Sequence, residues 1–368
     1  MNEDRSTRYH RLQRRTAWVG LATQLAGGIT LLGALSIPLR DAAVQLTGTP
    51  SQTLATVLVY TGALFVLAEF VSLPSRFYRT FILERRYGLS AVPFRSWIRD
   101  HVKAFAMGFI ISLVAAAIVY SAMAAWPRWW WAASAVAFIL ATLILARVAP
   151  VLLMPLFYRF KPLDREVLRA RLETLSARAG LPVLGIYEWG LGEKTTRANA
   201  ALVGTGRSRR ILLSDTLLSD YTDDEIEVIL AHELGHHAHR DIRTGLLLEA
   251  AMIAMSMGAA AVALGASWRP LALNGPADVA GLPLLLLVAG LVSLVARPGL
   301  NALSRRNEHR ADRFALELTE RPDAFVSAMR RLASQNLAEA RPSPTTLWLF
   351  HTHPPFEQRI QAAKSFIA

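Results

Sequence analysis

The stretch "VILAHELGHHAHRD", residues 228–241, places four histidines within eight residues and beside one glutamate. Residues four apart share one face of an α-helix, so His232 and His236 can direct their imidazoles at one metal ion, with Glu233 alongside. This is the HExxH arrangement, in which the histidines bind zinc and the glutamate is the general base for a water molecule. The alternative is a surface helix that is merely rich in histidine.

The other two histidines point elsewhere on such a helix. His237 is turned about 100° from His236, and His239 lies about 10 Å along the axis from His232. We expect neither to bind the ion. A catalytic zinc takes three protein ligands and keeps one open position, so a third ligand is needed. The chain has no cysteine, which excludes thiolate ligands, disulfides and cysteine nucleophiles.

The composition indicates an integral membrane protein. Hydrophobic residues make up 53% of the 368 residues, and the mean hydropathy of +0.30 is too high for an ordinary soluble domain of this length. The formal net charge is +12, but the arginines lie in loops between apolar segments, which favours membrane topology over nucleic-acid binding. The basic start, "MNEDRSTRYHRLQRR", argues against a secretory signal peptide.

Six apolar segments are close to the length of about 20 residues that crosses a bilayer. They are residues 17–39, 53–73, 104–125, 129–148, 245–266 and 279–296. The alternative is that one of them is a buried core helix. The N-terminal tail and the loop 74–103 are rich in arginine, whereas the loops 40–52 and 267–278 hold one arginine each. We therefore expect both termini and residues 149–244 in the cytoplasm, and the alanine- and arginine-rich composition suggests a bacterial cytoplasmic membrane.

These segments divide the chain into two regions. Residues 1–162 form a membrane region with four spans and the basic loop, and residues 163–368 contain the histidines and two further spans, at about 245–266 and 279–296. Thr222 and Glu225 form a capping box that starts the histidine helix. Three short runs bounded by turn residues predict a small sheet, at residues 183–190, 198–204 and 209–215.

A carboxylate is the candidate for the third ligand. The residue six positions after His236 is Ile242, which rules out a third histidine there. The stretch "LSRRNEHRADRFALEL", residues 303–318, offers Glu308 on a second helix, with Asp312 one turn further, placed to hydrogen-bond a ligating histidine. Such carboxylates are more often solvated charges. Position favours a ligand, because the histidine helix runs toward the fifth span and Glu308 follows the sixth by about twelve residues, near the same membrane surface.

Further blocks accompany these motifs. They are "LPSRFYRTFILERRYGLS" at 73–90, "APVLLMPLFYRFKPL" at 149–163, "ANAALVGTGRSRRILLSDTLL" at 198–218 and "HTHPPFEQRI" at 351–360. Together with "HELGHH" and "SRRNEHRAD", they resemble the integral-membrane zinc metalloproteases related to the CAAX prenyl protease of the a-factor-converting type, with the HtpX-like proteases as relatives. The first two blocks favour the prenyl protease branch.

The resemblance implies a mainly α-helical membrane bundle with a cytoplasmic, gluzincin-like zinc protease domain. One zinc ion per chain would be held by His232, His236 and Glu308, with Glu233 as the base, in agreement with the spacing. Asn199 and Ala200 are similar to the edge strand beside which such proteases lay the substrate backbone. His353 resembles a histidine that approaches the tetrahedral oxyanion, and Arg359 resembles an arginine near the site. Without the resemblance, Asn199 and Ala200 would be a plain strand end, and His353 would be a turn residue before a proline.

The eukaryotic members of the family are described with seven spans around a large water-filled chamber. Six spans here imply that one before Thr53 is absent. Glu69 and Glu249 are ionisable groups within spans, so we expect them to face such a chamber. The alternative is that their carboxylates reach the nearby cytoplasmic interface.

The function that we expect is a membrane zinc metalloendopeptidase, which hydrolyses peptide bonds at the cytoplasmic membrane face. Its partners would be the lipid bilayer and peptide or protein substrates, including lipid-modified or membrane proteins, and not nucleic acid. One alternative is an HtpX-like quality-control protease of damaged membrane proteins. Another is a non-proteolytic scaffold or transporter, although we see no inverted repeat of the transporter kind.

Overall fold

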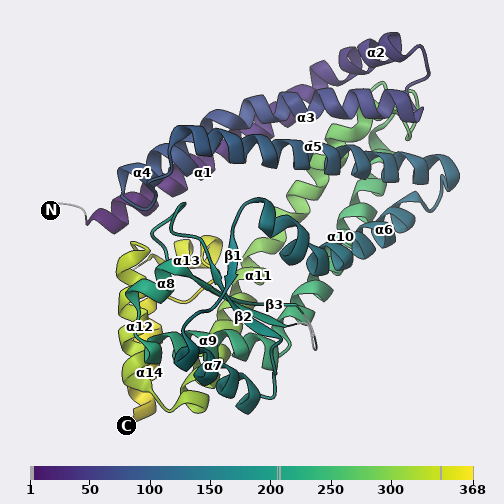
Figure 1. The fold of residues 1–368 in the computed structure, drawn as a ribbon. Helices are drawn as coiled ribbons and strands as arrows, with labels where there is room; N and C mark the ends of the chain where they lie inside the picture. The colour runs from purple at the N-terminus through teal and green to yellow at the C-terminus, as the bar shows by residue number, and fades with distance from the viewer. Residues whose placement is uncertain (1–3, 205, 207–208, 340–341, 368) are drawn as a thin grey trace.

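The computed structural model describes residues 4–204, 206, 209–339 and 342–367. Among these, six helical segments are long and apolar enough to cross a membrane, which confirms the predicted number. The segments are Arg5–Thr47, Leu54–Arg86, Phe94–Ala125, Trp130–Leu156, Asp241–Ser267 and Val279–Thr319. They form a long helical bundle attached to a smaller part that contains a β-sheet (Figure 1).

Three helices of the bundle, α1, α3 and α5, lie side by side, and α10 and α11 connect this layer to the part with the sheet (Figure 1). The N-terminal elements are α1 (Arg5–Thr30), η1 (Leu31–Leu35), α2 (Ser36–Thr47), α3 (Leu54–Phe77), η2 (Tyr78–Leu83), α4 (Glu84–Arg86), α5 (Phe94–Ala125), α6 (Trp130–Val148), η3 (Ala149–Leu153) and η4 (Met154–Leu156). The later helices are α7 (Glu166–Arg178), α8 (Asp215–Asp220), α9 (Asp223–Ala238), α10 (Asp241–Ser267), η6 (Val279–Gly281), α11 (Leu282–Thr319), α12 (Pro322–Gln335), α13 (Pro344–Phe350) and α14 (Phe356–Ile367).

The helices extend beyond the apolar segments that predict them. The first runs from Arg5 to Thr47 rather than over 17–39, and α11 continues past Ala296 to Thr319. The additional residues of α11 include many Arg, Glu, Leu and Ala, which are good helix formers, so the helix continues after the apolar pattern has ended. Glu308 therefore lies on the continuation of the helix of the sixth span, which is a different helix from the one that carries His232 and His236.

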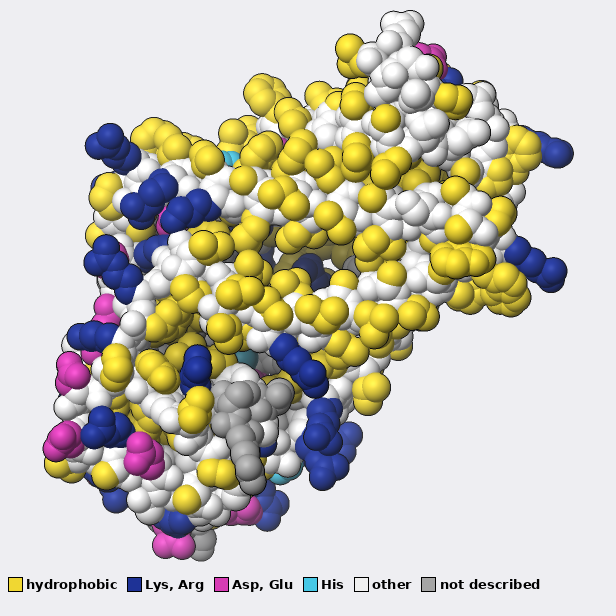
Figure 2. Space-filling model, turned by 45° about the vertical axis from the view of Figure 1, so that its right-hand side comes forward, with side chains coloured by type: hydrophobic (Ala, Val, Ile, Leu, Met, Phe, Trp, Pro, Cys, Tyr) yellow, Lys and Arg dark blue, Asp and Glu magenta, His cyan; other side chains and the backbone are white. Residues whose placement is uncertain are grey.

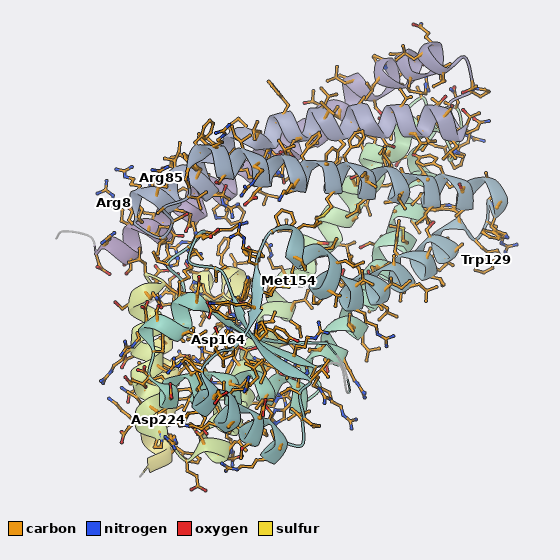
Figure 3. All side chains as sticks on the ribbon, viewed as in Figure 1. Arg8, Arg85, Trp129, Met154, Asp164 and Asp224 are labelled. Carbon is orange, nitrogen blue, oxygen red and sulfur yellow. The ribbon has the colours of Figure 1, made fainter. Side chains whose placement is uncertain are left out.

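The end of the bundle furthest from the sheet is held by a buried ion pair. Arg40 Nη1 lies 2.6 Å from Asp278 Oδ2, and the two residues are 7% and 2% exposed. Ser36 Oγ donates a hydrogen bond to the carbonyl of Ala280 at 2.6 Å. These contacts join α2 to the loop between α10 and α11, at the end where Trp129 lies in the α5–α6 turn (Figure 3).

Among the described residues, four strands form a mixed sheet in the order β1-β2-β4-β3. They are β1 (Phe160–Pro162), β2 (Gly185–Trp189), β3 (Ala200–Val203) and β4 (Arg210–Ser214). Strands β2 and β4 are parallel, whereas β1 and β3 pair antiparallel at the two edges. The predicted small sheet is confirmed, but the sequence pattern misses β1, because three residues that end in proline carry no strand signal.

Helix α9 packs against the sheet, α11 and α12, and carries the histidines. It starts with the predicted capping box: Thr222 Oγ1 accepts a hydrogen bond from the Glu225 backbone, and Glu225 Oε2 accepts one from the Thr222 backbone at 2.8 Å. The helix ends at Ala238, Arg240 takes a left-handed φ of 59°, and α10 begins separately at Asp241. The expectation that the histidine helix runs straight into the fifth span is therefore wrong, because a left-handed residue interrupts the helix.

Candidate metal centre

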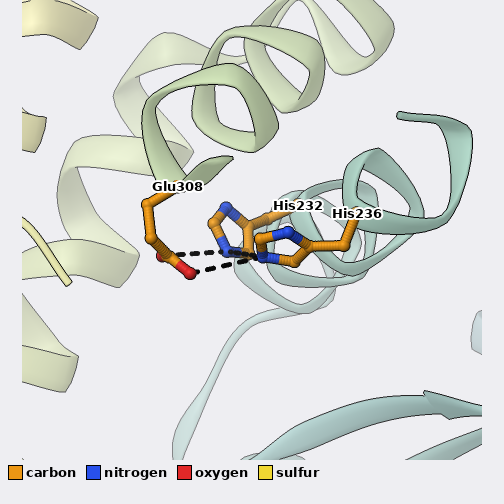
Figure 4. Close-up of side chains that lie close together, drawn as sticks. All are labelled: His232, His236 and Glu308. Atoms are coloured by element: carbon orange, nitrogen blue, oxygen red, sulfur yellow. Dashed lines mark hydrogen bonds and ion pairs between the residues drawn. The ribbon is translucent and has the colours of Figure 1, made fainter. Parts of the chain in front are cut away.

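Two helices bring three of the predicted residues together (Figure 4). His232 and His236 come from α9 and Glu308 from α11, and one donor atom of each lies within 4.8 Å of the others. The two Nε2 atoms are 3.2 Å apart. Glu308 Oε2 is 3.4 Å from His232 Nε2, and Glu308 Oε1 is 3.4 Å from His236 Nε2. The three donors therefore converge on one point.

This donor set fits a small divalent cation. A tetrahedral ion with nitrogen ligands at about 2.0–2.1 Å, as zinc has, holds its donors roughly 3.3 Å apart, close to the separations of 3.2 and 3.4 Å found here. Glu308 is buried, and its two oxygens face three imidazole nitrogens, those of His232 and His236 at 3.4 Å and that of His353 at 2.9 Å. Two imidazole nitrogens that face each other also need a cation or a proton between them.

Each histidine of the pair is held by its own carboxylate. His232 Nδ1 lies 2.9 Å from Asp312 Oδ1, and Arg359 donates two hydrogen bonds to the same carboxylate, at 2.5 and 2.8 Å. Burial lowers the pKa of His232, but the carboxylates of Asp312 and Glu308 outweigh burial and raise the pKa to about 9. The structure thus places Asp312 and Arg359 behind His232, His236 and Glu308, the candidate metal-binding group (below, the metal-binding group), where they orient the His232 ring.

The second carboxylate, Asp241, escapes the sequence analysis. His236 Nδ1 lies 2.9 Å from Asp241 Oδ2, and Arg310 contacts the other oxygen. Five residues along a continuous helix would turn Asp241 about 140° away from His236. The break at Arg240 returns it to the same side. In the sequence, the only sign of this contact is that an acidic residue ends the stretch 228–241. That residue can be interpreted only when the position at which the helix ends is known.

Glu233 and His353 stand at the open side of this group. Glu233 is half-buried and lines the same cavity as His232 and Glu308. Burial raises the pKa of its carboxyl above the ordinary value, which suits a group that accepts a proton. His353 lies in the loop between α13 and α14, with Nδ1 2.9 Å from Glu308 Oε2 and a side chain that is 64% exposed.

Gly235 sets the separation of the two helices that carry the ligands. A Cβ atom at this position would lie 3.0 Å from the Cα and 3.3 Å from the carbonyl oxygen of Ala311 on α11. Backbone atoms cannot move aside as a flexible side chain can, so a larger residue would push α9 and α11 apart. The glycine inside HELGH therefore has a packing role, directly before His236 and about one turn after His232.

The structure places Asn199 and Ala200 at the free edge of the sheet. The Ser214 backbone donates to the Asn199 carbonyl at 2.9 Å. Because hydrogen-bonded pairs alternate along antiparallel strands, Ala200 turns its N–H and C=O away from β4. Both residues line the cavity. Further along the edge, the Leu202 carbonyl accepts a hydrogen bond from His237 Nε2 at 3.0 Å, so His237 points to the strand and not to the metal-binding group.

A cavity of about 970 Å³ leads from the metal-binding group toward the membrane helices. It is walled by α9, α11 and the loop before α14 at one end, and by α1 and the start of η2 at the other. Figure 2 shows an opening between the apolar side chains of the long helices, with Lys or Arg side chains visible inside it. The site is thus continuous with a hollow that borders the membrane-spanning helices.

Two acidic residues do not face this cavity, contrary to expectation. Glu69 lies 2.9 Å from Arg76 Nη1, which neutralises it, and 3.3 Å from His101 Nε2 on α5. Glu249 is exposed on α10. Neither is among the described residues that line the cavity. His239 also lies apart from the metal-binding group, and its Nδ1 donates to the Gly235 carbonyl at 2.8 Å.

Curated relatives and a solved structure are similar to this chain. The uncharacterized metalloprotease YhfN of Bacillus subtilis (strain 168) is 32% identical over 286 residues, which cover 76% of this chain and 66% of the relative. The probable CAAX prenyl protease 1 of Schizosaccharomyces pombe is 27% identical over 307 residues, which cover 83% and 65%. The matched parts thus span just under two thirds of these relatives. The crystal structure of S. mikatae Ste24p superposes with a TM-score of 0.85 over 97% of this chain and 87% of that chain, at 23% sequence identity, which shows a shared fold.

Two family models divide the chain between them. The model described as "CAAX prenyl protease N-terminal, five membrane helices" matches residues 1–159, where the described residues form four candidate spans. The model described as "Peptidase family M48" matches residues 162–367, more than half of the chain, and this range includes both histidines and the glutamate of the metal-binding group. The chain therefore belongs to peptidase family M48.

Proposed function

We propose that this protein is a zinc metalloendopeptidase that hydrolyses peptide bonds at the cytoplasmic face of a membrane, with lipid-modified protein C-termini of the CAAX kind as its substrate class. The observation that carries the proposal is the convergence of His232, His236 and Glu308 beside Glu233, in a cavity that reaches the membrane helices. The names of the relatives support the substrate class, since several are called CAAX prenyl protease 1.

The side chains divide the reaction between them. Zinc bound to the three ligands would supply a Lewis acid for the scissile carbonyl and make water more acidic. Glu233 takes a proton from the attacking water and passes it to the leaving amine, and its raised pKa favours the first transfer. His353 donates a hydrogen bond to the oxyanion that develops on the carbonyl oxygen. The free N–H and C=O of Ala200 pair with the substrate backbone and hold it extended across the site.

We assign the site to the cytoplasmic side of a bacterial membrane. Arg8 and Arg85 lie at the end of the bundle next to the protease part, and Trp129 lies at the other end (Figure 3). The loops at the site end are rich in arginine, whereas those at the far end contain few charges. Short loops rich in Lys and Arg remain in the cytoplasm, and an even number of spans returns both termini to that side.

Metal content and a Glu233→Gln variant test this proposal. The purified full-length protein should bind about one zinc ion, and chelation should abolish cleavage of a farnesylated CAAX peptide. Glu233→Gln should keep the zinc and lose about 10²–10⁴-fold in kcat, since it removes only the base. Glu173→Gln, an exposed glutamate on α7, is the matched control and should be unchanged. A zinc-free protein, or a fully active Glu233→Gln variant, contradicts the proposal.

The substrate class needs a test of its own. A farnesylated CAAX peptide and a misfolded membrane protein are supplied together to the zinc-loaded enzyme, and the cleavage products of both are measured by mass spectrometry. Preferential cleavage of the farnesylated peptide is expected. Cleavage of the misfolded protein alone would leave the peptidase mechanism in place and assign the enzyme to quality control.

A further inference from the structure

Two exposed arginines in the cavity wall have no partner among the described residues. Arg297 comes from α11 and Arg79 from η2, and both line the cavity that contains the metal-binding group. Neither makes a hydrogen bond, an ion pair or a ring contact among the described residues. The other cavity-lining arginines are paired, Arg14 with Glu339 at 2.5 Å and Arg359 with Asp312 at 2.5 Å.

The carboxylates of the cavity cannot serve these two arginines. Glu339 is paired with Arg14 and lies 4.0 Å from His351. Glu308 faces the imidazoles, and Glu233 lines the wall beside them. This part of the cavity wall thus carries two positive charges without a counter-charge among the residues that the structure describes. Ionisable groups at the ends of membrane spans that face a cavity mark binding sites for charged ligands, here an anion.

On helix α11, Arg297 lies on the same face as Glu308 of the metal-binding group. Arg297 and Glu308 are eleven residues apart, which is about 16 Å along the helix and a net rotation of only about 20°. Asn301 lies between them on the same stripe and also lines the cavity. An anion held by Arg297 would therefore lie directly along the helix from the ligand group. An extended peptide, at about 3.3–3.6 Å per residue, covers about 16 Å in about five residues, and a shorter segment of about three suffices where the Arg297 side chain extends along the helix toward Glu308.

We propose that Arg297, assisted by Arg79, binds the C-terminal carboxylate of a peptide whose scissile bond lies at the metal-binding group, three to five residues upstream. The inference rests on the proposed peptidase function and adds to it a subsite that measures the distance from the cleavage point to the chain end. A guanidinium that pairs with a carboxylate in two parallel hydrogen bonds is well suited to this recognition. An internal segment of a long protein has no carboxylate at that distance and would be cleaved less well.

The test compares two forms of one farnesylated CAAX peptide, with a free C-terminal carboxylate or with a C-terminal amide. The zinc-loaded full-length enzyme should favour the carboxylate form by about tenfold or more in kcat/KM, mainly through KM. Arg297→Gln should reduce this preference to less than about threefold. Arg306→Gln is the control, because Arg306 is exposed on the opposite face of the same helix and should keep the full preference. Six residues added after the CAAX sequence should remove the preference in the wild type.

A binding measurement separates this inference from the proposed function. The zinc-loaded Glu233→Gln protein is titrated with both peptides, labelled at the N-terminus, and fluorescence anisotropy is recorded. Tighter binding of the carboxylate form that is lost with Arg297→Gln supports the subsite, even if the wild type cleaves neither peptide and the peptidase proposal fails. Equal binding and equal cleavage of the two forms overturns the subsite.

A lipid headgroup is the other source of an anion. The same assays are therefore run in nanodiscs of phosphatidylcholine and of phosphatidylglycerol. The carboxylate preference should persist in both. If Arg297→Gln instead changes both peptides equally, and only in phosphatidylglycerol, the arginine binds lipid and the inference is overturned.

Discussion

Two buried polar clusters lie at opposite ends of this molecule and differ in how well their atoms are satisfied. At the far end of the bundle, Asp278 Oδ2 accepts hydrogen bonds from Arg40 and from the Asn274 backbone, and Oδ1 accepts one from the Ala280 backbone. At the site, the buried Glu308 faces imidazole nitrogens at 2.9–3.4 Å, and the Nε2 atoms of His232 and His236 face each other at 3.2 Å with no protein group between them among the described residues.

The comparison distinguishes polar groups that stabilise the fold from polar groups that are placed to bind a ligand. A buried charge is tolerated when its partners are all present, and the Arg40 cluster supplies them from its own chain. The site cluster is complete only with a cation. Substitutions in the first cluster should therefore change the stability of the protein and leave its metal content alone, whereas substitutions around the second should change metal binding.

The largest expected effect is on stability, at the far end of the bundle. Asp278→Ala leaves the Arg40 charge buried without its main partner, which should cost about 3–5 kcal/mol of unfolding free energy. Asp41→Ala removes an exposed partner of the same arginine and should cost less than about 1 kcal/mol. Thermal unfolding in detergent compares the two, and the zinc content per folded molecule should be unchanged in both. Loss of zinc with Asp278→Ala would remove the distinction between the clusters.

Gly235→Ala should lower both the stability of the protein and its affinity for zinc, because Gly235 lies where α9 packs against α11. The added Cβ would meet the backbone of Ala311 at 3.0 Å, and overpacking of this kind costs about 1–3 kcal/mol. Displacement of α9 from α11 should also weaken zinc binding, measured by competition with a chelating dye. Gly245→Ala, with no heavy atom within 4 Å, is the control and should lose neither stability nor zinc. An unchanged zinc affinity in Gly235→Ala would show that α11 can follow the shift.

Asp241→Asn should weaken metal binding with little change in fold stability. It reduces the negative charge that orients His236, and loss of such a partner lowers metal affinity by about 10–100-fold. Asp323→Asn, also an acid in the first turn of a helix, is exposed and serves as the control. Isothermal titration with zinc compares them. Equal affinities would mean that Asp241 only caps α10.

The smallest effect is expected at the start of α9 and depends on pH. Burial alone would raise the pKa of Glu225, but hydrogen bonds from Ser327 and Thr222 outweigh burial and hold the pKa below its usual range. The stabilisation is therefore present above the unfolded pKa of about 4.3 and is lost as the pH falls through the folded value. Glu225→Gln should cost about 1 kcal/mol at neutral pH and progressively less in acid, by denaturation at several pH values. A difference that does not depend on pH would contradict this account.

The sequence predicts much of this architecture because its strongest signals are local. The span count follows from apolar runs of about 20 residues, and the histidine pair follows from the spacing of four on one helix. Glu308 lies 72 positions after His236. The prediction that it lies near the two histidines rests on the observation that Glu308 and the histidines flank the same pair of membrane spans. His353 was indicated by the resemblance alone.

What the sequence does not predict depends on breaks and on distant partners. Asp241 reaches His236 because Arg240 is left-handed, and no hydropathy pattern marks that residue. Arg40 counts as an ordinary loop charge in the sequence, yet it is buried against a residue 238 positions away. The helix ends are also displaced, since charged residues that favour helix continue α11 to Thr319.

The course of helix α11 has a consequence for how the site is assembled during synthesis. The histidines precede the α10–α11 hairpin in the chain, and Glu308 lies beyond it on the same helix that crosses the membrane. During synthesis, a chain that has emerged only as far as the histidines has an incomplete ligand set. The set closes when the last membrane hairpin has been made and packed, so a newly made molecule holds the complete group of His232, His236 and Glu308 only after it has reached the bilayer.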